Sequence, residues 1–293
     1  FYLMIEASNA DYNYYTYGFM RYAYIYTTNG KMINDKFGFC NHYAYMINGQ
    51  NRDPDIGYPL MIKAGSNWSR DEIKWDSFET TKGEYRFQKM HEKYLSAAEQ
   101  YGINHLLILV HGNSLYGGIG PYKIPQTDEQ LEAYGKYCYE LVKRLKGRVD
   151  AFEFWNEFDL DPTPEATDEL YVKLAKVTYE SVKRANPEAS TVGICAGVHA
   201  PEESISNIFG MDGWRYMDDM SFHRYLDGGD YRLKGNPIDT DFRSSINALR
   251  KIIDGYKPEM KLWLTETGYS SVLMSNRHRA AAYIVQTFAA AME

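Results

Sequence analysis

The chain has 293 residues, of which 44% are hydrophobic and 24% charged, proportions typical of a globular protein. Its net charge of -7 and the lack of a dense basic run argue against a nucleic-acid partner. The sequence contains no apolar run of about 18 residues, so no transmembrane helix is predicted. The three cysteines, Cys40, Cys138 and Cys195, match neither zinc-site nor redox-motif spacing, and we expect Cys138 and Cys195 to be buried free thiols.

Residues 1–36 differ from the rest of the chain because they lack its regular alternation of strand and helix patterns. Residues 1–5 and 17–27 predict antiparallel strands, and Asn29-Gly30 predicts a hairpin turn at residues 28–31. We therefore interpret residues 1–36 as an N-terminal β-rich segment, either a cap or the remnant of a preceding β-domain.

From residue 37 onward, strand-like runs alternate with helical patterns. Strands are predicted at residues 37–42, 67–71, 104–110, 149–155, 191–196, 220–223 and 261–268. Helices are predicted in a short segment that ends near residue 64 and at residues 87–101, 127–147, 167–185, 241–256 and 275–292. Thr127 and Gln130 form a capping box, and Gly102 is suited to end the helix before it.

Strands that are joined by helical crossovers must lie parallel to one another. Seven such units predict that residues 37–293 form a (β/α)₈ TIM barrel. An open doubly wound sheet is the main alternative, but it would normally carry a Gly-rich phosphate loop after its first strand. No eighth strand follows the last helix, so we expect a C-terminally truncated barrel domain; an N-terminal strand that fills the gap is the other interpretation.

Polar side chains stand at nearly every predicted strand end. They are His42, Arg70, His111, Asn113, Asn156, Glu157, His223, Tyr225 and Glu266. Catalytic groups of barrel enzymes lie at these ends, and a carboxylate at the end of a buried strand is costly unless it is paired or used. The sequence therefore predicts that Glu157 and Glu266 face one cavity, which is the minimum equipment for cleaving a glycosidic bond.

Four motifs in chain order resemble clan A of the glycoside hydrolases. Trp155-Asn156-Glu157 is similar to the strand-four acid/base motif of that clan, and residues 264–268, with Glu266, are similar to its strand-seven nucleophile motif. Residues 64–85 resemble the strand-two region of family 39, and residues 221–225 resemble the strand-six motif. The resemblance runs from residue 37 to the end of the chain; Phe158 departs from it, since many clan members have proline there.

The resemblance implies a retaining hydrolase of O-glycosidic bonds in oligo- or polysaccharides, which works by double displacement and needs neither cofactor nor metal. Glu157 is expected to be the acid/base and Glu266 the nucleophile, with Arg70 as the cation beside them. Candidate substrate-binding residues are Arg70, Asn156 (at the 2-hydroxyl), His223 and Tyr225 as neutral donors, His42, His111 and Asn113 in the adjacent subsite, and Trp155, which either stacks on sugar or packs between strands. The family is mostly secreted or periplasmic, and we expect the same localisation here.

Other interpretations stay open on the sequence alone. The two glutamates could be structural carboxylates, and the barrel could bind carbohydrate without turning it over. An ester or amide hydrolase would need a serine beside a histidine, but Ser221 and His223 are neighbours on one strand and do not supply triad geometry. No His/Asp cluster has metal-site spacing. Glu153 is interpreted as pointing into the barrel core with a polar partner and is assigned no role in the site, and we expect Trp263 to face the helices.

Overall fold

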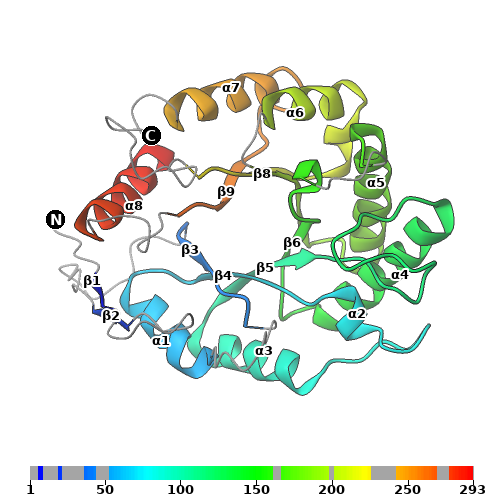
Figure 1. Ribbon diagram of the computed structural model, residues 1–293, viewed down its shortest axis with the longest axis horizontal. Helices are drawn as coiled ribbons and strands as arrows, with labels where there is room; N and C mark the ends of the chain where they lie inside the picture. The colour runs from blue at the N-terminus through cyan, green and yellow to red at the C-terminus, as the bar shows by residue number, and fades with distance from the viewer. Residues whose placement is uncertain are drawn as a thin grey trace.

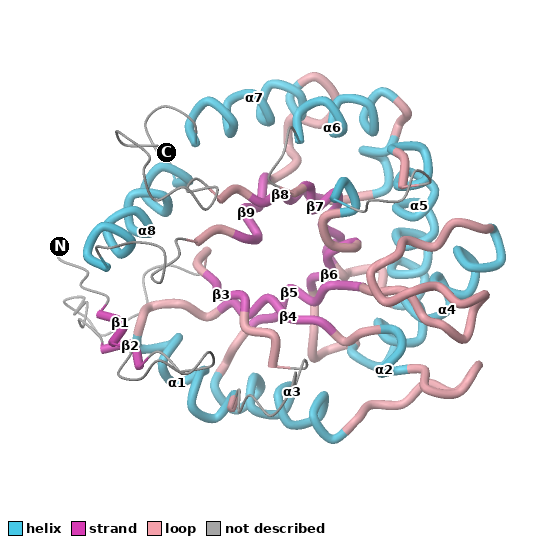
Figure 2. The backbone as a smooth tube through the Cα atoms, in the orientation of Figure 1, coloured by secondary structure: helices cyan, strands magenta, loops and turns pink. Residues whose placement is uncertain are grey.

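The computed structural model describes residues 6–8, 19–21, 36–43, 53–160, 166–197, 201–225, 242–268 and 277–292. Within them, seven parallel strands follow one another in chain order around a nearly closed barrel, and the helices form a ring outside it (Figures 1 and 2). The strands are β3 (Gly38–Cys40), β4 (Trp68–Glu72), β5 (Asn104–Leu109), β6 (Ala151–Phe154), β7 (Ser190–Ala196), β8 (Asp219–His223) and β9 (Leu262–Glu266). The predicted barrel, short of one strand, is confirmed.

The helices of the outer ring occupy the predicted places between the strands. They are α1 (Pro54–Lys63), α3 (Lys89–Tyr101), α4 (Asp128–Leu145), α5 (Asp168–Ala185), α7 (Arg243–Asp254) and α8 (Arg277–Met292), together with α2 (Trp75–Phe78) and α6 (Pro201–Gly210), which the sequence patterns did not predict. Short 3₁₀ turns lie at Phe158–Leu160 and Gly213–Tyr216. No described helix is both long and apolar enough to cross a membrane.

Local signals set the helix boundaries as predicted. The hydroxyl of Thr127 accepts the backbone N–H of Gln130, and the Gln130 side chain accepts the N–H of Thr127 in return, which completes the capping box of α4. Gly102 ends α3 with φ of 66°, in the left-handed region that a residue without Cβ reaches at no steric cost.

Two short strands precede the barrel. β1 (Glu6–Ser8) and β2 (Phe19–Arg21) pair antiparallel with each other, and β1 contacts α8. β2 lies inside the predicted strand at 17–27, whereas the predicted strand at 1–5 and the turn at 28–31 lie outside the described residues. Among the residues described, neither β1 nor β2 pairs with an edge of the barrel sheet, so they do not fill the position between β9 and β3.

Side-chain contacts link the two edge strands of the barrel sheet. The thiol of Cys40 on β3 donates to the carbonyl oxygen of Thr265 on β9 at 3.1 Å. Outside the sheet, Phe288 of α8 stacks on Phe37, with ring centroids 4.8 Å apart. The ends of the sheet are therefore held close to each other although no backbone ladder joins them within the described chain.

The barrel interior has its own small apolar cluster, and Trp263 belongs to it. Leu106, Ala151 and Val192 pack there with Trp68 and Trp263. The indole N–H of Trp263 donates to Asp219 Oδ2 at 3.0 Å. The expectation that Trp263 faces the helices is therefore wrong.

The error comes from a register shift in β9. Phe222 pairs with Leu264 but His223 pairs with Glu266, so Thr265 is an extra residue between them. The shift reverses the alternation of side chains. Strict alternation from an inward-facing Glu266 would place Leu264 inside the barrel and Trp263 outside. Because of the shift, Leu264 packs against the outer core and Trp263 lies inside.

Candidate active site

Arg70 of β4 is the centre of the polar groups inside the barrel. Its side chain is 5% exposed. Nε donates to Glu153 Oε2 at 2.6 Å, Nη1 to Glu266 Oε1 at 2.5 Å and Nη2 to Asn156 Oδ1 at 2.9 Å. Only a planar guanidinium presents donors to three acceptors in such a fork, so a single buried cation fixes side chains from β6, β9 and the loop after β6.

Glu266 is held as a carboxylate. The Tyr225 hydroxyl donates to Oε2 at 2.6 Å, while Arg70 occupies Oε1. Burial by itself would raise the pKa of Glu266, but the contacts of its carboxylate with His223, Arg70 and Tyr225 outweigh burial and lower that pKa below its usual range. Glu266 is thus ionised at neutral pH.

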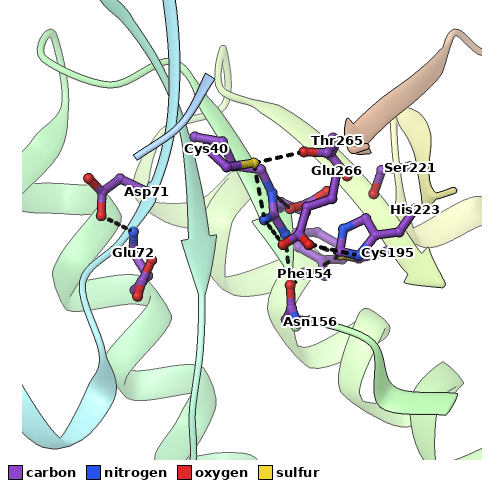
Figure 3. Close-up of polar contacts among 12 residues, drawn as sticks. Cys40, Asp71, Glu72, Phe154, Asn156, Cys195, Ser221, His223, Thr265 and Glu266 are labelled. Atoms are coloured by element: carbon purple, nitrogen blue, oxygen red, sulfur yellow. Dashed lines mark hydrogen bonds and ion pairs between the residues drawn. The ribbon is translucent and has the colours of Figure 1, made fainter. Parts of the chain in front are cut away.

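Glu157 approaches the same place from the loop after β6. His223 Nδ1 lies 2.8 Å from Glu157 Oε1 and 3.6 Å from Glu266 Oε2. One carboxylate oxygen of Glu157 and one of Glu266 lie within 4.8 Å of each other. The structure therefore brings both predicted carboxylates together with Arg70, Asn156, His223 and Tyr225. Figure 3 shows Asn156, Cys195, His223 and Glu266 turned toward one another.

A second polar pair lies at the ends of β3 and β4. His42 Nδ1 is 2.8 Å from Glu72 Oε2, and this hydrogen bond raises the pKa of His42. Burial would raise the pKa of Glu72, but the hydrogen bond with His42 outweighs burial and lowers it. Glu72 is two residues beyond Arg70 and so shares its face of β4; Figure 3 shows Asp71 and Glu72 set apart from the group around Glu266.

Two other predicted site residues, Trp155 and His111, pack against each other. Trp155 is 2% exposed and packs edge-on against His111 and Tyr134; of its two predicted roles, the structure shows packing. Burial lowers the pKa of His111 to about 4, so its ring is neutral.

Asn113 has its amide engaged within its own loop. Nδ2 donates to the carbonyl oxygen of Glu79 at 2.9 Å, and Oδ1 accepts the N–H of Leu115 at 3.0 Å. The structure does not bring Asn113 to the two carboxylates, and its predicted contact with sugar stays a prediction.

Sequence reasoning missed three members of the site. Glu153, to which no role was assigned, is fully buried and pairs with Arg70. Cys195 is a buried thiol, as predicted, but its sulfur lies 3.2 Å from His223 Nε2. Glu72 forms the pair with His42. Of these, only Glu153 left a usable signal, since a glutamate inside a buried apolar strand requires a cationic partner.

Two groups of side chains offer metal-ligating atoms within 4.8 Å of one another in the described residues. They are Glu153, Cys195 and His223, and Glu157, His223 and Glu266. In each group Arg70 already donates to one of the carboxylates. A metal ion would have to compete with this buried guanidinium, so the donor sets do not fit a resident metal.

Comparison with known proteins gives matches in structure but not in sequence. No protein-family model matches the chain, and no curated protein matches it in sequence. The structure is similar to a family 39 glycoside hydrolase from the gut symbiont Bacteroides cellulosilyticus WH2, with a TM-score of 0.71 and 25% identity over 87% of this chain and 53% of that one.

Other solved structures of the same family are similar at lower identity. A family 39 β-xylosidase from Caulobacter crescentus has a TM-score of 0.64 and 17% identity over 88% of this chain and 59% of that one. A family 39 enzyme from Xanthomonas axonopodis pv. citri has a TM-score of 0.59 and 16% identity over 80% of this chain and 51% of that one. The chain thus spans between 51% and 59% of the length of these proteins. Its fold is that of clan A glycoside hydrolases, of the family 39 type.

Proposed function

We propose that the protein is a retaining O-glycoside hydrolase, with Glu157 as the acid/base and Glu266 as the nucleophile. The observation that carries the proposal is the pair of carboxylates that meet at His223, with oxygens within 4.8 Å of each other. Retaining enzymes hold their carboxyl groups about 5–5.5 Å apart, whereas inverting enzymes leave about 6.5–9.5 Å for a water molecule. The spacing therefore favours direct attack by a carboxylate.

In the first step, an oxygen of Glu266 forms a bond to the anomeric carbon while the bond from that carbon to the leaving oxygen breaks. Glu157 gives its proton to the leaving oxygen. Arg70 and Tyr225 hold Glu266 ionised beforehand, and they stabilise it again when it leaves. Asn156 accepts from Arg70 through Oδ1, which leaves its NH₂ group to donate to the 2-hydroxyl of the sugar.

In the second step, water attacks the anomeric carbon of the glycosyl-enzyme. Glu157, now ionised, takes a proton from that water, and Glu266 departs as a carboxylate. Two displacements at one carbon return the configuration of the substrate. The partner is an oligo- or polysaccharide, in keeping with the glycoside hydrolases that share this fold.

A carbohydrate-binding barrel without activity is the competing function. Arg70 pairs with Glu266 and helps to keep it ionised, whereas among the described residues Glu157 has no salt bridge to a lysine or arginine. A protein that only binds carbohydrate would not need this difference. The difference in environment between the two carboxylates favours the hydrolase, because acid/base catalysis requires one donor and one ionised partner.

The test is a panel of aryl glycosides and polysaccharides with the wild type, Glu157→Gln and Glu266→Ala. We expect hydrolysis of at least one glycoside by the wild type, with retention seen by proton NMR of the first-formed product, and nearly complete loss in both variants. Azide should rescue Glu266→Ala and give a glycosyl azide of inverted configuration, since azide enters the space of the nucleophile. Binding without turnover, or full activity in either variant, would overturn the proposal.

A further inference from the structure

A β-bulge in β7 turns Cys195 toward the site. Ile194 pairs with Ser221 and Ala196 with Phe222, so Cys195 is the extra residue between them. Ile194 has φ of 79° and Cys195 has φ of 52°, a backbone region in which β-branched residues are rare. Strain of this kind persists where the surrounding structure imposes it, and it gathers at functional sites.

The bulge exchanges the faces of two side chains. Val192 belongs to the cluster inside the barrel, so regular alternation would point Ile194 inward and Cys195 outward. Instead, Ile194 packs in the outer core, and its N–H donates to the Tyr171 hydroxyl of α5 at 2.8 Å. The thiol of Cys195 is thereby placed among the site residues, as bulges beside active sites often re-aim a side chain.

Cys195 contacts the groups that hold both carboxylates. Its sulfur lies 3.2 Å from His223 Nε2 and 3.4 Å from Arg70 Nη2, with Asn156 Oδ1 farther away at 3.8 Å. Its carbonyl oxygen accepts the N–H of Glu157 at 3.0 Å. Cys195 therefore contacts both Arg70, which holds Glu266, and His223, which contacts Glu157.

The hydrogen bonds around the sulfur assign its proton. Burial raises the pKa of Cys195 well above its usual range, so the thiol keeps its proton. Arg70 has only donors and must point one at a sulfur lone pair. Two acceptors are within reach of the S–H: Asn156 Oδ1 at 3.8 Å, which also accepts from Arg70, and Nε2 of His223 at 3.2 Å. The nearer of the two is Nε2 of His223.

We propose that Cys195 is a positioning residue whose S–H donates to Nε2 of His223 and fixes the neutral tautomer that carries its proton on Nδ1. That Nδ1–H then donates to Glu157 Oε1, which leaves the other oxygen of Glu157 to carry the catalytic proton toward the leaving group. The effect on catalysis rests on the proposed function. Without the thiol, a proton on Nε2 would turn the bare Nδ1 toward Glu157, and the acid proton would be drawn to His223 instead.

The test compares Cys195→Ala, Cys195→Ser and the control Cys138→Ala, which removes the buried thiol of α4. We expect Cys195→Ala to lower kcat by about tenfold, the effect of one hydrogen bond, with KM little changed and the limb of the pH profile that reports Glu157 displaced. Cys195→Ser, which keeps a donor, should recover most of kcat. Cys138→Ala should retain the wild-type kcat and profile.

The ring nitrogens of His223 give a readout that does not depend on turnover. In protein labelled with ¹⁵N-histidine, we expect a protonated Nδ1 and a bare Nε2 in the wild type, and a shift toward the other tautomer in Cys195→Ala. An Nε2–H tautomer or an imidazolium in the wild type would overturn the proposal, as would unchanged kinetics in Cys195→Ala. If the wild type hydrolyses no glycoside, the proposed function fails, and the nitrogen shifts still decide this proposal.

Discussion

Replacing Arg70 by lysine tests whether the fork of hydrogen bonds, rather than the positive charge alone, organises the site. Arg70→Lys keeps the charge and much of the apolar stem. A lysine ammonium is a single point charge, so it cannot reach Glu153, Asn156 and Glu266 in the geometry that the guanidinium uses. We expect it to keep one of these partners and to lose the other two.

The magnitude follows from the burial of Glu153. This carboxylate is fully buried, and its Oε1 has no hydrogen-bond partner among the described residues, so Arg70 is the group that compensates its charge. Removing one partner of a buried pair costs about 3–5 kcal/mol, and hydrogen bonds to charged groups are each worth about 1.5–3 kcal/mol. Arg70→Lys should therefore lower the free energy of unfolding by about 3 kcal/mol and kcat/KM by about 100-fold.

Urea unfolding followed by circular dichroism measures the loss of stability, and hydrolysis of the best aryl glycoside measures kcat/KM. Arg86→Lys is the matched control, because Arg86 pairs with Glu84 on the surface, where both side chains are more than half exposed, and such pairs contribute little. Adding Glu153→Gln to Arg70→Lys should restore part of the stability by removing the uncompensated charge. An Arg70→Lys variant within about 1 kcal/mol of the wild type would refute the reasoning.

Three further changes have defined signs. Tyr225→Phe removes a donor to Glu266 and so should raise its pKa, moving the acidic limb of the activity profile to higher pH; an unmoved limb would exclude this contact from the mechanism. Glu72→Gln removes the partner that raises the pKa of His42, so the His42 titration seen by NMR should move to lower pH, and a titration at its wild-type position would contradict the pairing. Burial raises the pKa of Asp71 to about 7, above its unfolded value of about 3.9, so its contribution to stability is full below about pH 4 and is lost as pH rises toward 7. Asp71→Asn should flatten the fall in unfolding free energy over that interval, and an equally steep fall would point to another group.

The barrel and most of its site were open to prediction because both depend on short-range signals. Each βα unit can be recognised by a change of hydrophobic period between its strand and its helix, and the carboxyl ends of parallel strands lie at the same edge of the sheet. Glu157, Glu266 and Arg70 could therefore be grouped without knowledge of any contact. The helix α6 could have been found as well, because it begins with Pro201 followed by Glu202 and Glu203, a common pattern for a first helical turn.

What could not be predicted depends on single extra residues in strands. Side-chain direction reverses after a bulge, and nothing in the composition of β7 or β9 reveals one. Cys195 therefore looked like an ordinary buried thiol, and Trp263 was assigned to the wrong face. The pairing of Glu153 with Arg70 joins residues 83 positions apart, and no local pattern encodes which buried ions meet.

The hydrogen bond between Arg70 and Glu266 has a consequence for the order in which the chain folds. It joins residues 196 positions apart and crosses the barrel interior between strands that are not neighbours in the sheet. Contacts of such long sequence separation carry a high loop-closure cost and slow the folding of a chain. During refolding, helical signal should return before β9 docks beside β8, and the proposed hydrolase activity should return only once the contact between Arg70 and Glu266 has formed.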